Sequence, residues 1–418
     1  MNESNSWSMN DCLTFLYFRY CPAGGTTDIP PQIRSAISNQ PLESSKQNLL
    51  ERGKQCVRDS IKKYIEDVGE NNTHVVPLSG GLDSRTILAG LVTSDEIDQQ
   101  DVITVSFGSP KTWDFELGQQ IARAAGVKNI AIDLTSSEID WSIDKLLNVA
   151  QLSSKPVPIL EARANRLPIE NFEQENTVFW SGFMGDPSVG SHQPSDLHGD
   201  WELAKSEFID DNLIMGDSLL HKPDFFEHLP NEAYFDESLL SYEEQLDFAI
   251  RQENYIRPTV VPDKQYLTPF FCDEWLSFWL NIPRNQRRGR KLFRRVVCSA
   301  FPDLFSLPSS TNYGLPITSS RLLGNINGVK KIATNWLTSK IYARTYTHPN
   351  TNYLNFGPSL RGPNQLHKSA EYLLESFEER DILETNLSSV WNRHQAGEDH
   401  TELIRSVMSL ESHMLSNQ

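Results

Sequence analysis

The chain has 418 residues, of which 38% are hydrophobic and 22% charged, and its formal net charge is -17 at pH 7. This length favours one large α/β unit with a smaller helical unit, and the acidic charge argues against nucleic acid as a partner, since phosphate binding requires a basic surface. No segment approaches the roughly 20 apolar residues of a membrane span, and five cysteines without a C-x-x-C pair suggest neither a disulfide framework nor a zinc knuckle. We therefore expect a cytoplasmic protein.

The first strong element is a buried-strand pattern at residues 74–78, which continues into Ser79-Gly80-Gly81-Leu82-Asp83-Ser84 and then into a helical pattern over 84–91. Further along, the patterns predict strands at 102–107, 129–134 and 177–180 and helices at 114–125 and 139–152. Repeated β-α-β units predict an α/β fold with a parallel sheet covered on both faces. Because ligands of such sheets bind at the carboxyl ends of the strands, the loops at Ser79, Ser106 and Ser181 are expected to converge on one crevice.

The second half of the chain has a different pattern. Residues 194–262 show weaker periodicity, and we interpret them as an excursion that covers the crevice. Helical patterns follow at 275–281 and 290–300 and then continue to the C-terminus. We expect an N-terminal connector-like extension over 1–60, the main domain over 61–320 and a helical C-terminal region over 321–418.

The segment from Ser79 to Ser84 is the residue pattern most specific for chemistry. Two glycines let the backbone turn sharply and approach an anion, while two serines and the start of the next helix offer donors. The alternative is a serine-capped turn before a helix, in which Asp83 merely favours the positive helix end. The loop lacks the lysine and spacing of a Walker A motif, so it predicts a different kind of phosphate cradle.

This loop resembles the S-G-G-x-D-S signature of the ATP-pyrophosphatase (PP-loop) superfamily, and other segments narrow the resemblance to the asparagine synthase-like synthetase domain. Residues 15–33 resemble the connector that precedes this domain, and Asp114 lies in a helix similar to the family's S-P-D helix. Residues 181–186 match the S-G-E-G-A-D-E loop in part, residues 269–273 resemble the R-x-P-F-L-D segment, and residues 291–295 keep the spacing of a K-x-x-x-R helix. The resemblance runs in collinear order over nearly the whole chain.

The resemblance implies a site for ATP and Mg²⁺. The β- and γ-phosphates would be held by Ser79, Gly80, Gly81, Asp83 and Ser84. The rest of the nucleotide would be bound by Leu78, Phe107, Ser181 and Gly182. Asp83 and Asp186 would share magnesium, which requires oxygen ligands from two facing loops. Lys291 would stabilise charge in both chemical steps, with Arg295 one turn further along the same helix.

A dense cationic run surrounds Lys291. Its members cannot share one helix face, so we expect Arg287, Arg288 and Arg294 on a solvated face and Arg284 in a salt bridge.

Departures from the family pattern bear on the substrate. The glutamate that takes part in amide formation is Phe183 here, the next glycine is Met184, and the glutamate after the aspartate is Pro187. A general base is thus missing at that point, and an acceptor other than aspartate is expected. No cysteine stands at position 2, so the glutaminase half is expected to be absent. Nitrogen would come from free ammonia, a separate glutaminase chain or an amine on the substrate.

Four functions remain open on the sequence. The first is an amide-forming ligase for a small carboxylate, for example a uronic acid; the second is a ring-closing enzyme similar to lactam and lasso-peptide synthetases. The third is a tRNA-modifying relative, which the acidic charge disfavours, and the fourth is a non-catalytic relic. His192 and His198 flank the Asp186 loop as substrate contacts or as ordinary surface residues. Histidine spacing indicates no zinc site.

Overall fold

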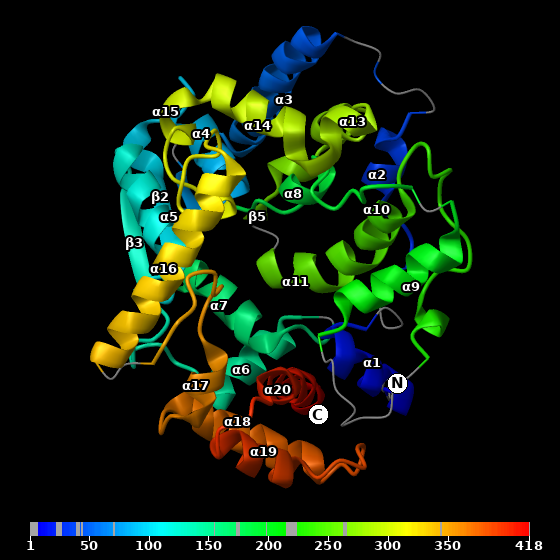
Figure 1. Ribbon diagram of the computed structural model, residues 1–418, viewed down its shortest axis with the longest axis vertical. Helices are drawn as coiled ribbons and strands as arrows, with labels where there is room; N and C mark the ends of the chain where they lie inside the picture. Colours follow the sequence, from blue (N-terminus) through cyan, green and yellow to red (C-terminus); the bar gives the residue numbers. More distant parts are fainter. Residues whose placement is uncertain are drawn as a thin grey trace.

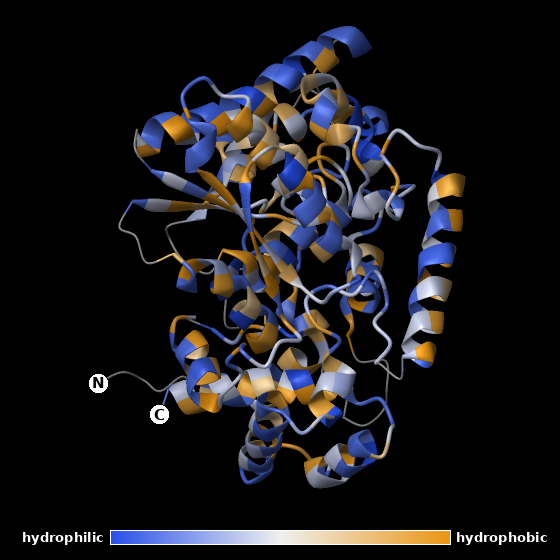
Figure 2. Cartoon of the chain, turned by 90° about the vertical axis from the view of Figure 1, so that its left-hand side faces the viewer, coloured by the Kyte–Doolittle hydropathy of each residue, from blue (hydrophilic) through white to orange (hydrophobic). Residues whose placement is uncertain are grey.

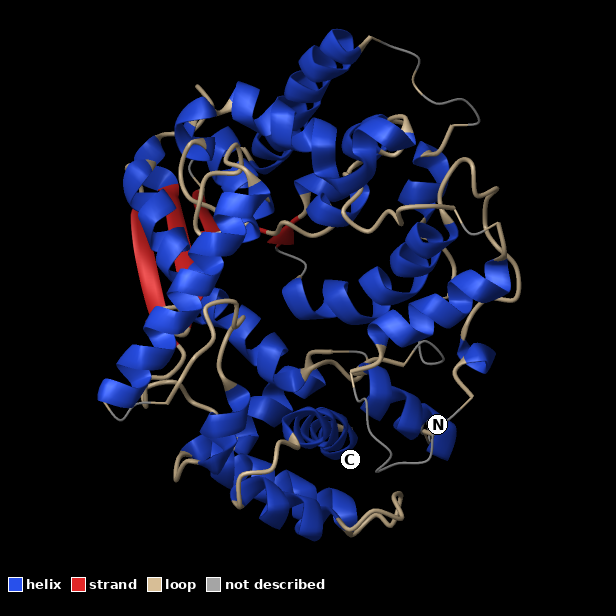
Figure 3. Cartoon of the chain, in the orientation of Figure 1, coloured by secondary structure: helices blue, strands red, loops and turns tan. Residues whose placement is uncertain are grey.

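The computed structural model describes residues 7–21, 27–38, 42, 45–69, 72–153, 155–172, 176–197, 199–214, 224–261, 266–342 and 345–417. It contains a sheet of five parallel strands in the order β3-β2-β1-β4-β5, which lies toward the left of the view in Figure 3. The strands are β1 (Thr73–Pro77), β2 (Val102–Gly108), β3 (Lys128–Asp133), β4 (Thr177–Trp180) and β5 (Tyr266–Leu267). The predicted α/β fold with a parallel sheet is therefore confirmed.

Helices surround this sheet (Figure 1). Those of the first half are α1 (Met9–Phe18), α2 (Pro31–Ala36), α3 (Lys46–Val68), α4 (Asp83–Val92), α5 (Trp113–Ala124), α6 (Ile143–Gln151), α7 (Ile159–Glu170), α8 (Gly185–Ser188) and α9 (Trp201–Asn212). The middle of the chain forms α10 (Tyr242–Leu246), a π-helix (Asp247–Ile256), α11 (Arg257–Val260), α12 (Asp273–Trp279), α13 (Arg284–Arg287), α14 (Lys291–Ala300) and α15 (Pro302–Phe305). The last helices are α16 (Arg321–Ile341), α17 (Phe356–Arg361), α18 (Gln365–Glu378), α19 (Leu387–Gln395) and α20 (Thr401–Ser416).

Both faces of the sheet are buried, which explains why its central strands are almost continuously apolar. On one face, Val75, Val105 and Phe179 form a cluster that packs against Ile169 and Phe172 at the end of α7. The other face belongs to the main core, where α5 contacts β2 and β3, and α3 contacts α4 and α14. The sheet is thus a rigid support for the loops at its carboxyl edge.

The two ends of the chain are built into the same body. Helix α1, whose residues from Cys12 to Phe18 are buried, contacts α20 near the C-terminus (Figure 1). Helix α3 runs across residue 60, where the connector-like extension was expected to end, and packs on α12 and α14. Helix α16 instead carries exposed apolar side chains such as Leu322, Val329 and Trp336, and it stands at one side of the molecule (Figure 2).

Among the described residues, no helix has the length and apolar character needed to cross a membrane.

Candidate nucleotide-binding site

The strand order places two loops next to each other. Strands β1 and β4 are hydrogen-bonded neighbours, but the chain continues from β1 to β2 on one side and from β4 to β5 on the other. In open α/β sheets such a switch point is where ligands bind, outside the carboxyl ends of the strands. The loop after β1 begins at Leu78 and the loop after β4 begins at Ser181, so both expected segments lie at this edge.

Two glycines bring these loops into contact. A Cβ on Gly182 would lie 2.9 Å from the Cβ of Asp83, and a Cβ on Gly185 would lie 2.7 Å from the Asp83 Cγ. Any larger residue at either position would push the second loop away from the first. The close approach therefore depends on glycine at both positions.

The first loop is held in a fixed shape by its own hydroxyl groups. The Ser79 amide donates to Ser84 Oγ at 3.2 Å, and the Gly81 amide donates to Ser79 Oγ at 3.2 Å. The Gly80 carbonyl accepts one hydrogen bond from the Arg85 side chain at 3.2 Å and another from Ser309 Oγ at 3.1 Å. Helix α4 starts at Asp83, so its first-turn amides lie beside the loop, as an anion site requires.

Asp114, expected on the helix after β2, lies under the same loop. Its carboxylate accepts hydrogen bonds from the Gly80 backbone and from Ser310, yet burial raises the pKa of Asp114 above its usual value. The residue supports the loop from within and does not line the cavity described below.

Asp83 and Asp186 face each other across the two loops. The Asp83 Oδ1 atom is buried and has no hydrogen-bond partner, whereas Asp186 Oδ1 is paired with Arg290. Burial and the Asp186 charge raise the pKa of Asp83 well above its usual range, and the Arg290 guanidinium partly offsets this rise. A buried carboxylate oxygen without a partner is costly, and a proton or a bound cation would relieve that cost.

The donor set fits Mg²⁺ held jointly with phosphates. Among the described residues, no group of three or more His, Cys, Asp and Glu side chains forms a metal site. Magnesium commonly takes one or two carboxylates from the protein and its other ligands from phosphate and water. Asp83 and Asp186, beside a loop shaped for anions, match that pattern.

The cationic run is arranged differently from the sequence expectation. Arg290 pairs with Asp186, and Arg294 is half-buried nearby, with a pKa lowered by burial and by the charges of Arg290 and Arg321. Lys291 and Arg295 lie exposed on α14, and neither lines the cavity. Arg290 was not singled out in the sequence. Its backbone is left-handed, with φ 62°, so that α14 begins only after it.

Two neighbours in the run also differ from expectation. Arg287, expected on a solvated face, is buried and ion-paired with Glu244 at 2.9 Å. That expectation was wrong because α13 and α14 are separated by a turn, so the run does not lie on one helix. Arg284 donates to the Pro194 carbonyl at 2.7 Å.

A cavity of about 340 Å³ opens between the two loops. The first loop contributes Ser79, Asp83 and Ser84, and the second contributes Ser181, Gly182, Phe183, Met184, Asp186 and Pro187. The opposite wall consists of residues from the 194–262 segment, namely Arg251, Gln252, Ile256 and Val260. The volume lies within the range of about 300–1,000 Å³ that is common for small-molecule sites.

Several residues expected to bind the nucleotide lie at the edge of this cavity or behind it. Leu78 is buried, and its carbonyl accepts from Ser106 Oγ at 3.1 Å. The Phe107 ring stacks on Tyr353, with 6.0 Å between ring centroids. Ser181 lines the cavity and donates from Oγ to the Val260 carbonyl at 3.2 Å. The structure therefore gathers Ser79, Asp83, Ser84, Ser181, Gly182 and Asp186 around one cavity, whose lining does not include Leu78, Phe107, Gly80 or Gly81.

Phe183 gives the cavity an apolar wall. Its ring packs edge-on against Phe271 at 5.4 Å, and the Arg257 guanidinium lies over both rings. Met184 has a left-handed backbone with φ 65°. This conformation is uncommon for a residue with a side chain and marks local strain.

His192 also lines the cavity, and its Nδ1 lies 2.9 Å from Asp247 Oδ2. Burial opposes the charged imidazole, but the Asp247 carboxylate outweighs it and raises the pKa of His192 above its usual value. His198, the other histidine expected near this loop, lies outside the described residues.

In comparisons with known proteins, no family model matches the chain and no curated protein matches its sequence significantly.

Proposed function

We propose that the chain is an ATP-dependent carbon-nitrogen ligase that adenylates a substrate carboxylate and then forms an amide from it. The observation that carries this proposal is the unpartnered, buried Asp83 Oδ1, which faces Asp186 beside an anion-binding loop at the switch point of the sheet. This arrangement agrees with the resemblance to the PP-loop core of asparagine synthase-like enzymes.

Each part of the site has a role in this proposal. Ser79, Ser84 and the first turn of α4 would bind the β- and γ-phosphates, and Asp83 and Asp186 would hold Mg²⁺, which neutralises phosphate charge. Arg290 is the cation that lies against this pair and would stabilise the departing pyrophosphate. Lys291 and Arg295 remain predictions for the same role, since they lie on the adjoining helix.

Two bond exchanges make up the reaction. An oxygen of the acceptor carboxylate bonds to the α-phosphorus while the bond to pyrophosphate breaks. The nitrogen of ammonia or of an amine then bonds to the acyl carbon, AMP leaves with the electron pair, and the nitrogen loses one proton. Free ammonia, a separate glutaminase chain and an amine on the acceptor itself are all compatible nitrogen sources.

Phe183 cannot accept that proton. His192 is the histidine that lines the cavity, and Asp247 orients its ring through Nδ1. We assign His192 the role of proton acceptor, in place of the glutamate of asparagine synthetases. Its raised pKa predicts that amide formation increases as the pH rises through the titration of His192, because only the neutral ring can accept a proton.

Titration of Mg-ATP into the protein tests the proposal. Wild-type protein should bind Mg-ATP, and Asp83→Ala should weaken binding by at least about tenfold, which corresponds to 1.4 kcal/mol. Asp133→Ala is a control, because Asp133 is an aspartate at the carboxyl end of β3 but lies outside the cavity lining. Failure of the wild-type protein to bind Mg-ATP would favour the non-catalytic relic.

A further inference from the structure

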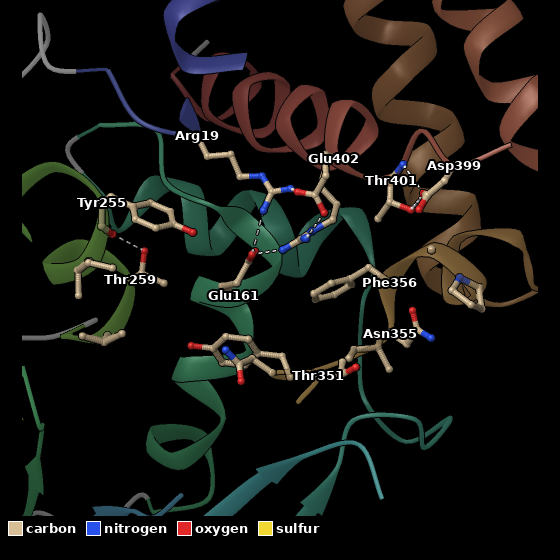
Figure 4. Close-up of a pocket in the computed structure, with 18 of the residues that line it drawn as sticks. Arg19, Glu161, Tyr255, Thr259, Thr351, Asn355, Phe356, Asp399, Thr401 and Glu402 are labelled. Atoms are coloured by element: carbon tan, nitrogen blue, oxygen red, sulfur yellow. Dashed lines mark hydrogen bonds and ion pairs between the residues drawn. The ribbon is translucent and has the colours of Figure 1, made fainter. Parts of the chain in front are cut away.

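A second and larger cavity, of about 560 Å³, adjoins the first. Figure 4 shows its lining, which comes from Arg19 after α1, Glu161 of α7, the π-helix and the C-terminal segments around Phe356 and Glu402. Three side chains, Arg251, Ile256 and Val260, line both cavities. One stretch of helix therefore forms a shared wall, and a molecule in the second cavity lies next to the candidate nucleotide site.

The base of the second cavity is a closed network of charges. Arg19 pairs with Glu161 at 3.3 Å and with Glu402, while Arg405 pairs with Glu402 at 3.1 Å and with Glu161. The positive charges of the two guanidinium groups are thus balanced by the negative charges of the two carboxylates. The Arg405 Nε atom is nevertheless buried without a hydrogen-bond partner, and burial lowers the pKa of Arg405 well below its usual range. The network therefore contains one N–H donor, that of Arg405 Nε, which makes no hydrogen bond.

Arg251 is the charged side chain of the shared wall. Asp247 is the carboxylate beside Arg251, but it lies closer to His192, at 2.9 Å, than to the Arg251 guanidinium, at 3.5 Å. Asp247 also accepts hydrogen bonds from Gln252 at 3.1 and 3.2 Å. Asp247 therefore divides its hydrogen bonds among His192, Gln252 and Arg251, and the Arg251 guanidinium, which lines both cavities, can also donate to an anion there.

The remaining lining suits a molecule with hydroxyl groups. Tyr255 and Phe356 present aromatic rings, and Thr351, Asn355 and Asp399 present hydroxyl, amide and carboxylate groups (Figure 4). The short polar side chains can exchange hydrogen bonds with hydroxyl groups, whereas guanidinium groups of Arg251 and Arg405 already lie over the Tyr255 and Phe356 rings. Such a mixture selects a compact polar ligand over a purely apolar one.

We propose that the second cavity binds the acceptor as a small hydroxylated carboxylic acid of the sugar-acid type, with its carboxylate held by Arg251 at the shared wall. The role as acceptor rests on the proposed function, whereas the binding of a sugar acid does not. Arg251 is a binding residue here, and it would present the carboxylate toward the loop that contains Asp83.

The test compares four probes by saturation-transfer NMR and calorimetry: galacturonate, glucuronate, neutral galactose and hexanoate, which has no hydroxyl groups. Wild-type protein should bind at least one uronate at least about tenfold more tightly than galactose or hexanoate. Thr351→Trp should fill the cavity and weaken uronate binding by about tenfold or more, while Mg-ATP affinity stays within about twofold. Thr345→Trp, an exposed residue of the same segment that does not line the cavity, is the matched control.

A second variant tests the anchor itself. Arg251→Gln should abolish the preference for a uronate over galactose, and Arg251→Lys should restore part of it. The proposal is overturned if neither uronate binds, if galactose binds as well as the uronates, or if Thr351→Trp binds a uronate as tightly as Thr345→Trp. Uronate binding without Mg-ATP binding would instead remove the proposed function and leave the second cavity as a sugar-acid site.

Discussion

Asp83 shows at the scale of one residue how the site is prepared for a cation. Its carboxylate is buried beside Asp186, and its Oδ1 atom has no partner, so ionisation is unfavourable without a bound ion. The raised pKa in the folded protein means that Asp83 contributes most to stability below the unfolded pKa, near 3.9, and that this contribution is lost as the pH rises through the folded value.

Asp83→Asn should therefore stabilise the protein at pH 8 in the absence of ligand. We expect a gain of about 1–2 kcal/mol in the free energy of unfolding, a fraction of the cost of burying an ion, because Arg290 shares the site. The gain should vanish at about pH 2, well below the unfolded pKa, where the wild-type carboxyl is protonated in both the folded and the unfolded state. Denaturant unfolding at the two pH values measures this difference, and a variant less stable than wild type at pH 8 would contradict the assigned burial of charge.

Sequence reasoning reached Asp83 and Asp186 because their loops follow strands and contain recognisable spacing. It missed Arg290 because the left-handed backbone at Gly289 and Arg290 delays the helix start by one residue and turns a different side chain toward Asp186. The available signal was the glycine before Arg290, since a glycine inside a cationic helical pattern marks a possible break.

At the scale of elements, the site depends on how closely the loop after β4 approaches the loop after β1. Gly182 has no room for a Cβ, which would lie 2.9 Å from Asp83. The contact joins a loop to the first residue of α4 and does not involve the core, so its disruption should affect binding more than folding.

Gly182→Ala should weaken Mg-ATP binding by about tenfold, equivalent to 1.4 kcal/mol, because it separates the two carboxylates. Gly362→Ala is a suitable control, since its backbone φ of -78° accepts alanine and its nearest neighbour is the end of the Asn364 side chain. Equal Mg-ATP affinities for the two variants would show that the loop contact does not shape the site.

Local periodicity predicted strands β1, β2, β3 and β4 and helices α4, α5, α6, α12 and α14, but it predicted neither the order of the strands in the sheet nor several other elements. Strand β5 has only two residues, too few to show an alternating or continuous apolar pattern. The segment 194–262 looked irregular because α10, the π-helix and α11 follow one another, and the i→i+5 bonds of a π-helix do not keep the 3.6-residue spacing.

At the scale of the whole molecule, charged side chains connect the two ends of the chain to the middle. Arg19 follows α1, Glu161 lies on α7, and Glu402 and Arg405 lie on α20, where α1 packs. These residues are far apart in sequence, so no local pattern could have predicted the second cavity that they border. Only the folded chain brings them together.

Glu161→Gln should lower the free energy of unfolding by about 3 kcal/mol, because it leaves two buried guanidinium groups with one carboxylate. As a comparison, Glu116→Gln removes the exposed carboxylate that pairs with Lys331. This change should lower the free energy of unfolding by less than about 1 kcal/mol. Thermal and denaturant unfolding of the two variants can be compared directly. Equal losses would mean that the Arg19 and Arg405 network does not secure the ends of the chain.

At the same scale, the central proposal is tested most directly by identifying the products that the protein forms from ATP. Phosphorus NMR of wild-type protein with Mg-ATP, an ammonium salt and galacturonate should show AMP and pyrophosphate forming together, with Asp83→Ala inactive under the same conditions. Formation of ADP and inorganic phosphate by the wild-type protein would contradict adenylation of the acceptor.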